Sequence, residues 1–436
     1  MSIQQTSHIQ ALLARRERLL GPDTPLFYDR PLHLVRGEGV WLWDHEGRRY
    51  LDVYNNVPSV GHCHPDVVAA LARQAGKLNV HTRYLDEVVL DYAEDLLRTF
   101  DPELTTVTFT CTGSEANDVA LQMAQAVTGS TGIICTNATY HGNTAAVSQL
   151  ASIFTPVGGY KAHIRRIPSP ESYRVDAGLS GTALRDAYLD KVAEAIASLR
   201  REGLGVSALL VCPIFANEGL PEVPAGFMEA AVKMVREAGG LFIADEVQSG
   251  FARTGDHMWG YRMTGTVPDI VTLGKPMGAG HPIGGVVARR EHLVAYRKQF
   301  SYFNTFGGNP VSAAVGHEVL KVIQREGLLG NARDVGAYLR EGLRRLAQRH
   351  DVIGDVRGSG LFVGVELVTD RRTRSPASQA ARAVVNALRD RGILISRIGV
   401  HDNVLKLRPP LVFAREHADQ LLAEMDSTLT GLQRVA

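Results

Sequence analysis

The chain has 436 residues, of which 45% are hydrophobic and 21% are charged, a composition typical of soluble globular proteins. Its 47 basic and 46 acidic side chains leave a formal charge of +1. This balance argues against a nucleic-acid partner, because nucleic-acid-binding domains carry a strongly basic surface. No run approaches the roughly 20 apolar residues of a membrane span, and residues 1–20 lack the pattern of a signal peptide. We therefore expect a cytoplasmic protein that makes no membrane contact.

The first 60 residues are mixed, with a predicted β-hairpin over residues 39–54 around the turn "DHEG". From about residue 60 to residue 310, short apolar runs alternate with helical stretches. The predicted strands are Thr106–Thr110, Ile133–Thr136, Ala208–Val211, Leu241–Ala244, Ile270–Leu273 and Gly285–Ala288, and helices are predicted over 115–127 and 226–239. This alternation predicts an α/β fold with a mostly parallel sheet.

Beyond residue 310 the pattern predicts amphipathic helices over 336–350 and 378–392, with strands in "GLFVGVELV" and "NVLKLRPPL". The Ser-Pro stretches at 168–170 and 375–376 are predicted loops. We expect a large domain over residues 61–310. Residues 1–60 and 311–436 are expected to form a smaller α+β domain.

Ligands of open α/β sheets bind beyond the carboxyl ends of the strands, and three predicted strand ends carry unusual side chains. In "TVTFTCTGSEAND" a strand runs into Gly113 and Ser114, with a helix expected to begin near Glu115. Glycine admits an anion, serine adds a donor, and the free N–H groups of a helix N-terminus favour negative charge. This pattern predicts a phosphate site, although a simple helix cap explains it equally well.

The other two strand ends carry a carboxylate and an amine. Asp245 and Glu246 follow a strongly apolar strand in "LFIADEVQSG", and Lys275 follows another in "VTLGKPMGAGHP". A buried carboxylate needs a partner, or its pKa rises. The alternatives are a capping aspartate and a lysine that extends to solvent. A phosphate site, a carboxylate and a lysine together fit pyridoxal phosphate, whose aldehyde condenses with an amine and whose ring nitrogen is held protonated by a carboxylate.

Six motifs in order resemble the class III aminotransferase family of fold type I pyridoxal-phosphate enzymes, over nearly the whole chain. They are "GHCHP" (61–65), "TGSEAND" (112–118), "YHGN" (140–143), "FIADEVQSGFARTG" (242–255), "GKPMG" (274–278) and "FNTFGGNP" (303–310). The resemblance implies a mostly parallel sheet of the seven-stranded type, flanked by helices. It also implies that the enzyme is a homodimer with its active sites at the interface.

The same resemblance implies the site residues. Lys275 would form the Schiff base, Asp245 would contact the ring nitrogen, and Gln248 would lie near the ring hydroxyl. Further cofactor-binding residues would be Gly113 and Ser114 on the phosphate, Tyr140 stacked on the ring, His141 beside it, and Thr305 reaching the phosphate of the neighbouring subunit.

Metal and nicotinamide sites are not expected. The sequence His62-Cys63-His64 offers metal-binding side chains, but adjacent residues point apart, and the four scattered cysteines lack zinc spacing. The cysteines also favour a reducing compartment. No GxGxxG follows the first strand.

Within the family, the chain most resembles a subgroup of phospho-lyases that act on ethanolamine phosphate or phosphohydroxylysine. The phrases that carry this are "YNNVPSVGHCHP" (54–65), "LGKPMGAGHP" (273–282), "YFNTFGGNPVSAAVG" (302–316), "GDVRGSGLF" (354–362) and "HDNVLKLRPP" (401–410). Family aminotransferases usually carry an arginine where this chain has Lys406. Since lysine is a point charge and not a planar fork, the change favours a phosphate head group over an α-carboxylate. Arg83 and His401 are further candidates for substrate contacts.

A second departure lies in "VCPIFANEGLPEVPAGF", where family aminotransferases commonly have "EPxQGExG". Counting back from "PAGF" places Asn217 at the glutamate that masks the arginine, with Glu218 one position away. Cys212 and Phe215 would replace the first glutamate and the glutamine. The loss of this masking glutamate fits an enzyme that does not alternate between two substrates.

The leading hypothesis is therefore a phospho-lyase, in which Lys275 takes a proton from the carbon bearing the substrate amine and phosphate and ammonia are eliminated. The alternative is an ω-aminotransferase that moves an amino group from an amine to a keto acid such as pyruvate. A third hypothesis is a cofactor-binding regulatory module without turnover, against which the presence of Lys275, Asp245 and Tyr140 argues.

Overall fold

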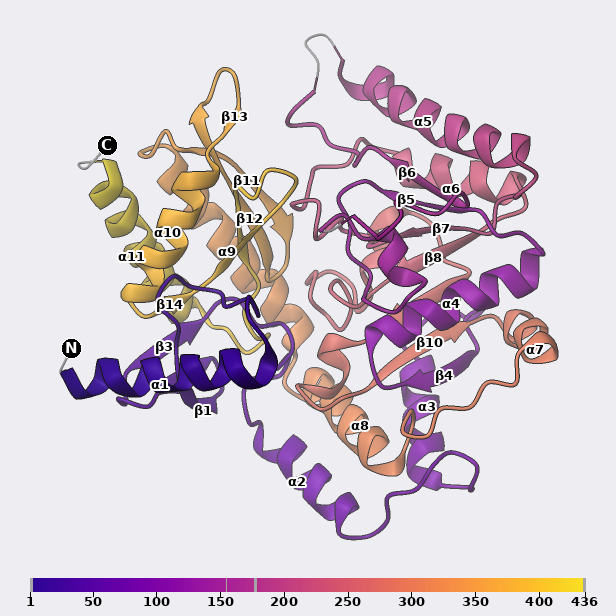
Figure 1. Cartoon of the computed structure of the whole chain (residues 1–436), viewed down its shortest axis with the longest axis horizontal. Helices are drawn as coiled ribbons and strands as arrows, with labels where there is room; N and C mark the ends of the chain where they lie inside the picture. Colours follow the sequence, from indigo (N-terminus) through magenta and orange to yellow (C-terminus); the bar gives the residue numbers. More distant parts are fainter. Residues whose placement is uncertain (1–2, 154, 176–178, 434–436) are drawn as a thin grey trace.

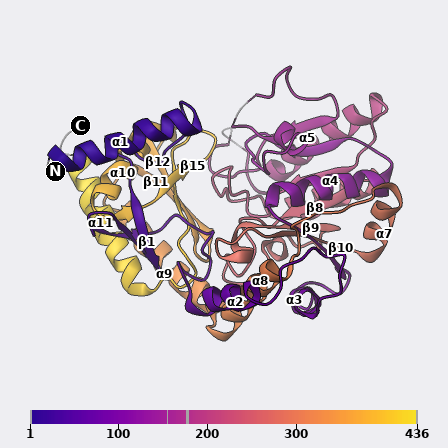
Figure 2. The same ribbon diagram turned by 60° about the horizontal axis from the view of Figure 1, so that its bottom comes forward.

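A computed structural model describes residues 3–153, 155–175 and 179–433. Figure 1 shows two parts side by side, one built around the large central sheet and the other around smaller sheets. The N-terminal helix α1 (Ile3–Leu20) and the C-terminal helix α11 (Arg415–Gln433) lie in the same part. Figure 2 shows from another side that both termini lie in this part. Segments far apart in the sequence therefore form the second part together.

The central sheet has seven strands in the order β4-β10-β9-β8-β7-β5-β6. Their bounds are β4 (Thr106–Thr110), β5 (Ile133–Thr136), β6 (Ile164–Ile167), β7 (Ala208–Val211), β8 (Leu241–Asp245), β9 (Ile270–Leu273) and β10 (Gly284–Ala288). Only β10 runs antiparallel to its neighbours. The expected mostly parallel sheet is confirmed, and the carboxyl ends of β4, β7, β8 and β9 meet at one edge.

Alternating residues of these strands face opposite layers of helices. On β8, Ile243 packs with residues of α4 (Gly113–Thr128), whereas Phe242 and Ala244 pack with residues of α6 (Phe227–Glu237). Helix α5 (Gly181–Arg201) packs on α6 and β6, and α7 (Arg290–Gln299) packs on α4. With helices on both faces, the central strands β5 and β7 are buried along their whole length, as is usual for parallel strands.

Two strands depart from the sequence-based expectation. Strand β6 (Ile164–Ile167) was not predicted, because its two central residues are arginines; it is an edge strand, where polar side chains reach solvent. The predicted loop at 375–376 is wrong: Ser375–Pro376 forms the short strand β13, paired antiparallel with β12.

The remaining strands form two smaller sheets. The expected hairpin is present as β2 (Trp41–Asp44) and β3 (Arg49–Asp52), flanked by β1 (Leu34–Glu38) and by the C-terminal β14 (Ile393–Leu394). The other sheet contains β11 (Ile353–Ser359), β12 (Phe362–Asp370), β16 (Val404–Leu407) and β15 (Ser396–Ile398), with β13 beside β12. The domain division at residues 61 and 310 stays a prediction.

Helices connect and cover these sheets. They are α2 (Pro65–Ala75), α3 (Glu87–Leu97), α8 (Pro310–Arg325), α9 (Leu328–Ala347) and α10 (Ser378–Asp390), with single-turn helices η1 (Val147–Leu150), η2 (Gly260–Thr264) and η3 (Lys275–Gly278). Helix α8 packs against α2, α3, η3 and α9. Over the described ranges, no helix combines the length and apolarity needed to cross a bilayer.

Candidate active site

A cavity of about 300 Å³ lies at the edge of the sheet where the carboxyl ends of β4, β7, β8 and β9 meet. Its lining includes most of the residues that the sequence singles out. They are Gly113, Ser114, Tyr140, His141, Asp245, Gln248 and Lys275, joined by Val57, Cys212, Val247 and the segment 280–283. The position agrees with the rule that open α/β sheets bind ligands beyond their strand ends.

The N-terminus of α4 opens into this cavity. The helix cap is Thr112, whose Oγ1 accepts a hydrogen bond from the Glu115 backbone N–H at 3.1 Å. The Ser114 hydroxyl is therefore not the cap. It lines the cavity instead, where its oxygen accepts a hydrogen bond from the Asn143 N–H at 3.3 Å. This arrangement keeps the positive end of the helix dipole and a hydroxyl available for an anion.

Two glycines leave space in the cavity around Ser114, because neither carries a side chain. Gly142 has a φ of +140°, and a Cβ built there would lie 2.6 Å from the Ser114 Oγ. A Cβ on Gly113 would lie 2.9 Å from a methyl carbon of Val247. Side chains at either position would fill the space beside the helix N-terminus, so the residues present fit a phosphate group there.

Asp245 is the last residue of β8 and is 5% exposed. Its Oδ2 lies 2.6 Å from the His141 Nδ1 and accepts a hydrogen bond from the Asn117 side chain at 3.1 Å. Its Oδ1 accepts a hydrogen bond from the Val247 N–H at 3.0 Å, as a capping aspartate would. Asn117 also accepts from Thr272 at 2.7 Å, which fixes its orientation. The carboxylate is thus held rigidly, and it still lines the cavity.

The neighbouring Glu246 faces away from the cavity. Its carboxylate accepts hydrogen bonds from the Ser249 hydroxyl at 2.6 Å and from the backbone N–H groups of Gly260 and Tyr261 at 2.9 and 2.6 Å. Burial raises the pKa of Glu246 to about 7. Its role is to anchor η2, so only one of the two adjacent carboxylates serves the cavity.

Lys275 follows β9 at the start of η3, and its side chain lines the cavity, where it is exposed. The surrounding protein lowers the pKa of Lys275, and the positive charge of Arg408 lowers it further. The neutral amine is the form that condenses with an aldehyde and accepts a proton. An amine, a fixed carboxylate and an anion-binding helix end around one cavity fit pyridoxal phosphate.

Gln248 links this cavity to two cations behind it. Its Oε1 accepts hydrogen bonds from the Lys406 Nζ at 3.1 Å and from the Arg408 guanidinium. Its Nε2 donates to the Asn217 Oδ1 at 3.1 Å, and Asn217 in turn donates to the Tyr140 carbonyl at 3.0 Å. Lys406 and Arg408 do not line the cavity themselves; each is 4% exposed.

The glutamate beside Asn217 takes a different position. Glu218 is buried, accepts a hydrogen bond from the Thr136 hydroxyl, and leaves its Oε2 without a hydrogen-bond partner. Burial raises the pKa of Glu218, although the Thr136 hydrogen bond opposes this. Asn217, and not Glu218, contacts Gln248. That Asn217 takes the position of the masking glutamate stays a prediction.

Three candidates lie away from the cavity of this chain. Arg83 is exposed, with its guanidinium carbon 3.8 Å from the centre of the Phe303 ring. Thr305 is exposed in the loop before α8. His401 is exposed, and its carbonyl accepts a hydrogen bond from Ser378 at 2.6 Å. Within one chain, none of these side chains reaches the candidate active site.

Sequence reasoning missed Asn117 and Arg408, although both lie inside recognisable motifs. Asn117 belongs to "TGSEAND" and Arg408 to "KLRPP". One signal was available for Asn117: it lies one helical turn after Gly113, so its side chain is on the same face of the helix and near the same sheet edge. Nothing local distinguishes Arg408 from a surface arginine.

The histidines of "GHCHP" have structural partners. His62 lies 2.7 Å from the Asp52 carboxylate, and His64 caps α2 through Nδ1 while its Nε2 lies 3.0 Å from Glu326. No group of metal-ligating side chains occurs in the described part of the chain.

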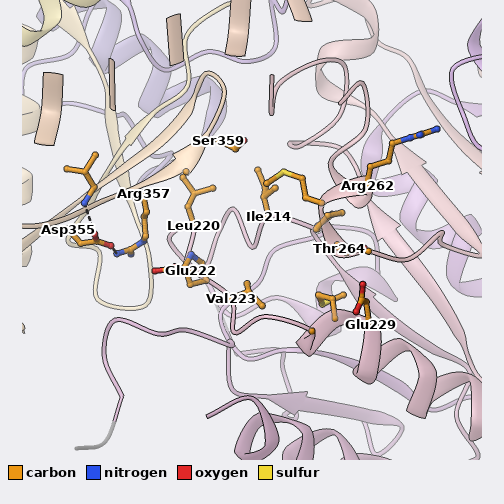
Figure 3. A pocket seen from close by; sticks show the side chains of 18 of the residues that line it. Ile214, Leu220, Glu222, Val223, Glu229, Arg262, Thr264, Asp355, Arg357 and Ser359 are labelled. Carbon is orange, nitrogen blue, oxygen red and sulfur yellow. Dashed lines mark hydrogen bonds and ion pairs between the residues drawn. The ribbon is translucent and has the colours of Figure 1, made fainter. Parts of the chain in front are cut away.

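A larger cavity of about 750 Å³ lies on the other side of the turn after β7 (Figure 3). Cys212 lines the smaller cavity, whereas Pro213 and Ile214 line the larger one. Figure 3 shows Asp355 and Arg357 on one side of it; they form an ion pair at 3.0 Å. Since no lysine is among the residues that line this larger cavity, whereas Lys275 lines the smaller one, the smaller cavity is the candidate active site.

Comparisons with known proteins show the family and the fold of the chain. The family described as "Aminotransferase class-III" matches residues 28–429. An alanine–glyoxylate aminotransferase 2-like protein of Drosophila melanogaster is 39% identical over 440 residues, which cover 99% of this chain and 89% of that protein. The solved structure of a phospholyase from Arthrobacter in complex with phosphoethanolamine is 47% identical, with a TM-score of 0.94, and covers 96% of this chain and 99% of that one.

A solved amine transaminase from an uncultivated Pseudomonas species, in its pyridoxal-phosphate-bound form, is 30% identical, with a TM-score of 0.85. The match covers 92% of this chain and 95% of that one. Together these matches confirm the fold class and the resemblance that the motifs indicate.

Proposed function

The chain belongs to the aminotransferase class-III family, and from this premise we propose that it is a pyridoxal-phosphate-dependent phospho-lyase. Its substrate would be a small phosphorylated amine such as ethanolamine phosphate or phosphohydroxylysine, and its products an aldehyde, ammonia and phosphate. The observation that carries the choice of reaction is the 47% identity, over nearly the full length, with a phospholyase described in complex with phosphoethanolamine.

The residues of the cavity would hold the cofactor at its two ends. Ser114 and the first N–H groups of α4 would bind its phosphate, and Gly142 leaves room for it. Asp245, kept in place by His141 and Asn117, would hold a proton on the ring nitrogen. When bound, pyridoxal phosphate condenses with amines and withdraws electrons from the carbon next to the nitrogen.

Lys275 performs the proton transfer in this proposal. As a neutral amine it takes the proton from the carbon that bears the substrate nitrogen, and its lowered pKa favours that form. The electron pair left on that carbon expels phosphate from the adjacent carbon, and water then releases ammonia and the aldehyde. Lys406 replaces the arginine that fits a carboxylate, which supports a phosphate head group.

The second candidate function is an ω-aminotransferase, favoured by the 39% identity with an alanine–glyoxylate aminotransferase 2-like protein. Both reactions share the proton abstraction by Lys275 and differ in where the released electron pair and the proton then go.

The test is to incubate the cofactor-loaded enzyme with ethanolamine phosphate and no keto acid. Catalytic release of phosphate and ammonia supports the lyase. Turnover only after addition of pyruvate would favour the aminotransferase.

We also propose a homodimer, because Thr305 and Arg83 are exposed beside an apolar surface. Tyr84 is 64% exposed, Leu85 99% and Phe306 70%. In a dimer these side chains would be covered, and Thr305 would reach the cofactor phosphate of the partner. Light scattering tests this: the wild type should have twice the mass of the chain, and Leu85→Lys should be a monomer.

A cytoplasmic location is likewise proposed, supported by four unpaired cysteines among the described residues.

A further inference from the structure

One loop lies between the two cavities. It consists of residues 212–220, which follow β7; Cys212 lines the smaller cavity, whereas Ile214 and Leu220 line the larger one. Figure 3 shows Ile214 and Leu220 on the wall of the larger cavity. A side chain that borders on a cavity has no packing contacts on that side. Packing therefore supports this loop incompletely, and its position depends on its hydrogen bonds.

The backbone of this loop is strained at two bulky residues. Phe215 has a φ of +48° and Leu220 a φ of +57°. Residues with a side chain rarely adopt such values, because the Cβ then lies too close to a carbonyl oxygen. Both side chains are buried, at 1% and 4% exposure. Since a strained backbone keeps its conformation only where surrounding contacts hold it, the contacts of the loop decide its shape.

On the side of the smaller cavity, the loop contacts two residues of the candidate active site. Asn217 accepts a hydrogen bond from the Gln248 Nε2 at 3.1 Å and donates one to the Tyr140 carbonyl at 3.0 Å. Gln248 and Tyr140 both line that cavity. A shift of the loop would therefore move both residues relative to a bound cofactor.

On the other side, the guanidinium of Arg357 holds the loop. Its Nε donates a hydrogen bond to the Gly219 carbonyl at 2.9 Å. Among the described residues, no other hydrogen bond joins the backbone of residues 214–220 to the rest of the chain. Gly219 has a φ of +102°, and a Cβ there would lie 3.2 Å from a methyl carbon of Val404 and 3.4 Å from the Arg357 Nη2. Glycine at this position thus lets the guanidinium approach the carbonyl.

Two carboxylates fix Arg357 itself. Its Nη1 donates a hydrogen bond to the Asp355 Oδ2 at 3.0 Å, and its Nη2 lies 2.5 Å from the Glu366 Oε2. Glu366, on β12, is fully buried and also pairs with Arg174. Each of the three nitrogens of the Arg357 guanidinium thus has an acceptor of its own. The planar fork of an arginine permits this arrangement, whereas a lysine has a single nitrogen.

We propose that Arg357 is a positioning residue for the cofactor site. Through the Gly219 carbonyl it holds the loop in the strained conformation in which Asn217 contacts the residues that line the smaller cavity. Arg357 lies on β11, outside the central sheet, so it also links the two parts of the molecule that Figure 1 shows. This gives a role to the motif "GDVRGSGLF" (354–362). The assignment rests on the proposed function in one respect, that the smaller cavity holds pyridoxal phosphate.

Arg357→Gln removes the donor to Gly219 together with both ion pairs. We expect the affinity of the full chain for pyridoxal phosphate to fall by about tenfold, in line with the loss of one hydrogen bond from a charged donor. The visible absorbance band of the bound cofactor should shift as well, because the groups around it move. Equilibrium dialysis and absorbance spectra of the loaded enzyme, both without substrate, measure these effects. A general loss of stability would lower the melting temperature without shifting the band.

Two further variants separate the loop contact from the ion pairs. Arg357→Lys keeps a positive charge near Glu366 and should still show most of the loss of affinity, because lysine does not reproduce the fork. Arg174→Gln is the matched control, since Arg174 pairs with the same carboxylate, but its Nε donates to the Arg374 carbonyl at 3.0 Å and not to the loop. Its melting temperature should fall, while its cofactor affinity stays within about twofold of wild type and its spectrum is unchanged.

Asn217→Ala tests the route of the effect. It should shift the absorbance band in the same direction as Arg357→Gln. The double variant should bind the cofactor no more weakly than the weaker of the two single variants, since both substitutions break one chain of contacts. Additive losses in the double variant would overturn the proposal, and so would a wild-type spectrum and affinity in Arg357→Gln. Wild-type affinity in Arg357→Lys would likewise overturn it, whether or not Arg357→Gln folds.

Failure of this proposal is distinct from failure of the lyase function. Wild-type cofactor affinity and spectrum in Arg357→Gln, in an enzyme that cleaves ethanolamine phosphate, would overturn the role of Arg357 alone. An enzyme whose cofactor binding depends on Arg357, but which releases no phosphate from ethanolamine phosphate, would support that role and overturn the lyase function.

Discussion

Asp245→Asn tests whether the carboxylate at the end of β8 stabilises the reaction electrostatically. The substitution keeps the size of the side chain and removes its charge. At 5% exposure, an effective dielectric constant of about 20 applies, and two opposite charges about 4 Å apart then attract by about 4 kcal/mol. Losing this attraction corresponds to about a thousandfold fall in rate. The assay is kcat for phosphate release from ethanolamine phosphate, at saturating cofactor and substrate.

Asp269→Asn is a matched control for this substitution. Asp269 is also buried, at 7% exposure, and its Oδ2 accepts hydrogen bonds from the Phe242 N–H at 2.9 Å and the Arg236 Nε at 3.1 Å. It precedes β9, at the opposite end of the sheet from the cavity. We expect it to lower the melting temperature, because an ion pair is lost, while kcat stays within about threefold of wild type.

Two results would refute the reasoning about Asp245. The first is an Asp245→Asn enzyme, saturated with cofactor, whose kcat is within about tenfold of wild type. The second is an equal loss of kcat in both variants, since the effect would then stem from general destabilisation and not from charge in the cavity.

Three further predictions concern the cavity and its surroundings. Lys275→Ala should lower phosphate release by at least about 10²–10⁴-fold, the usual contribution of a general base; single-turnover kinetics check this, and residual activity above a hundredth of wild type would contradict it. Gly142→Ala should weaken cofactor binding, because its Cβ would lie 2.6 Å from the Ser114 Oγ; equilibrium dialysis measures this, and Gly158→Ala, with φ +79° but no atom within 4 Å of its Cβ, is the control. Glu246→Gln should flatten the pH dependence of stability. With its pKa raised from 4.5 to about 7, the wild type loses about 3 kcal/mol between these pH values, because the carboxyl ionises in the unfolded chain while the buried carboxyl keeps its proton. Urea unfolding across this range would contradict the idea if both proteins had the same slope.

The sequence by itself determined the strand ends and the residues placed on them. Lys275 and Asp245 each come after an uninterrupted apolar run bounded by turn-forming residues, so the strand and its end are encoded within about ten positions. Thr112 to Asn117 likewise encode a helix start locally. The parallel arrangement then brings these ends to one edge of the sheet, because right-handed βαβ connections leave little choice.

Local patterns did not determine strands that depend on distant neighbours. Strand β6 contains Arg165 and Arg166, which are tolerated because it lies at the sheet edge. The two residues of β13, Ser375 and Pro376, become a strand only through pairing with β12. In both cases the deciding factor is a partner strand and not an intrinsic preference of the residues.

The tertiary structure alone decided what lies behind the cavity. Gln248 meets Lys406 and Arg408 across sequence separations of 158 and 160 residues, and no local signal encodes such contacts. The same holds for Asn217 and Glu218, adjacent in sequence, of which only Asn217 contacts Gln248. The amino-acid composition determines only the net charge, whereas the energy of each charged side chain depends on its burial and on its partners. Burial and partners exist only once the chain has folded.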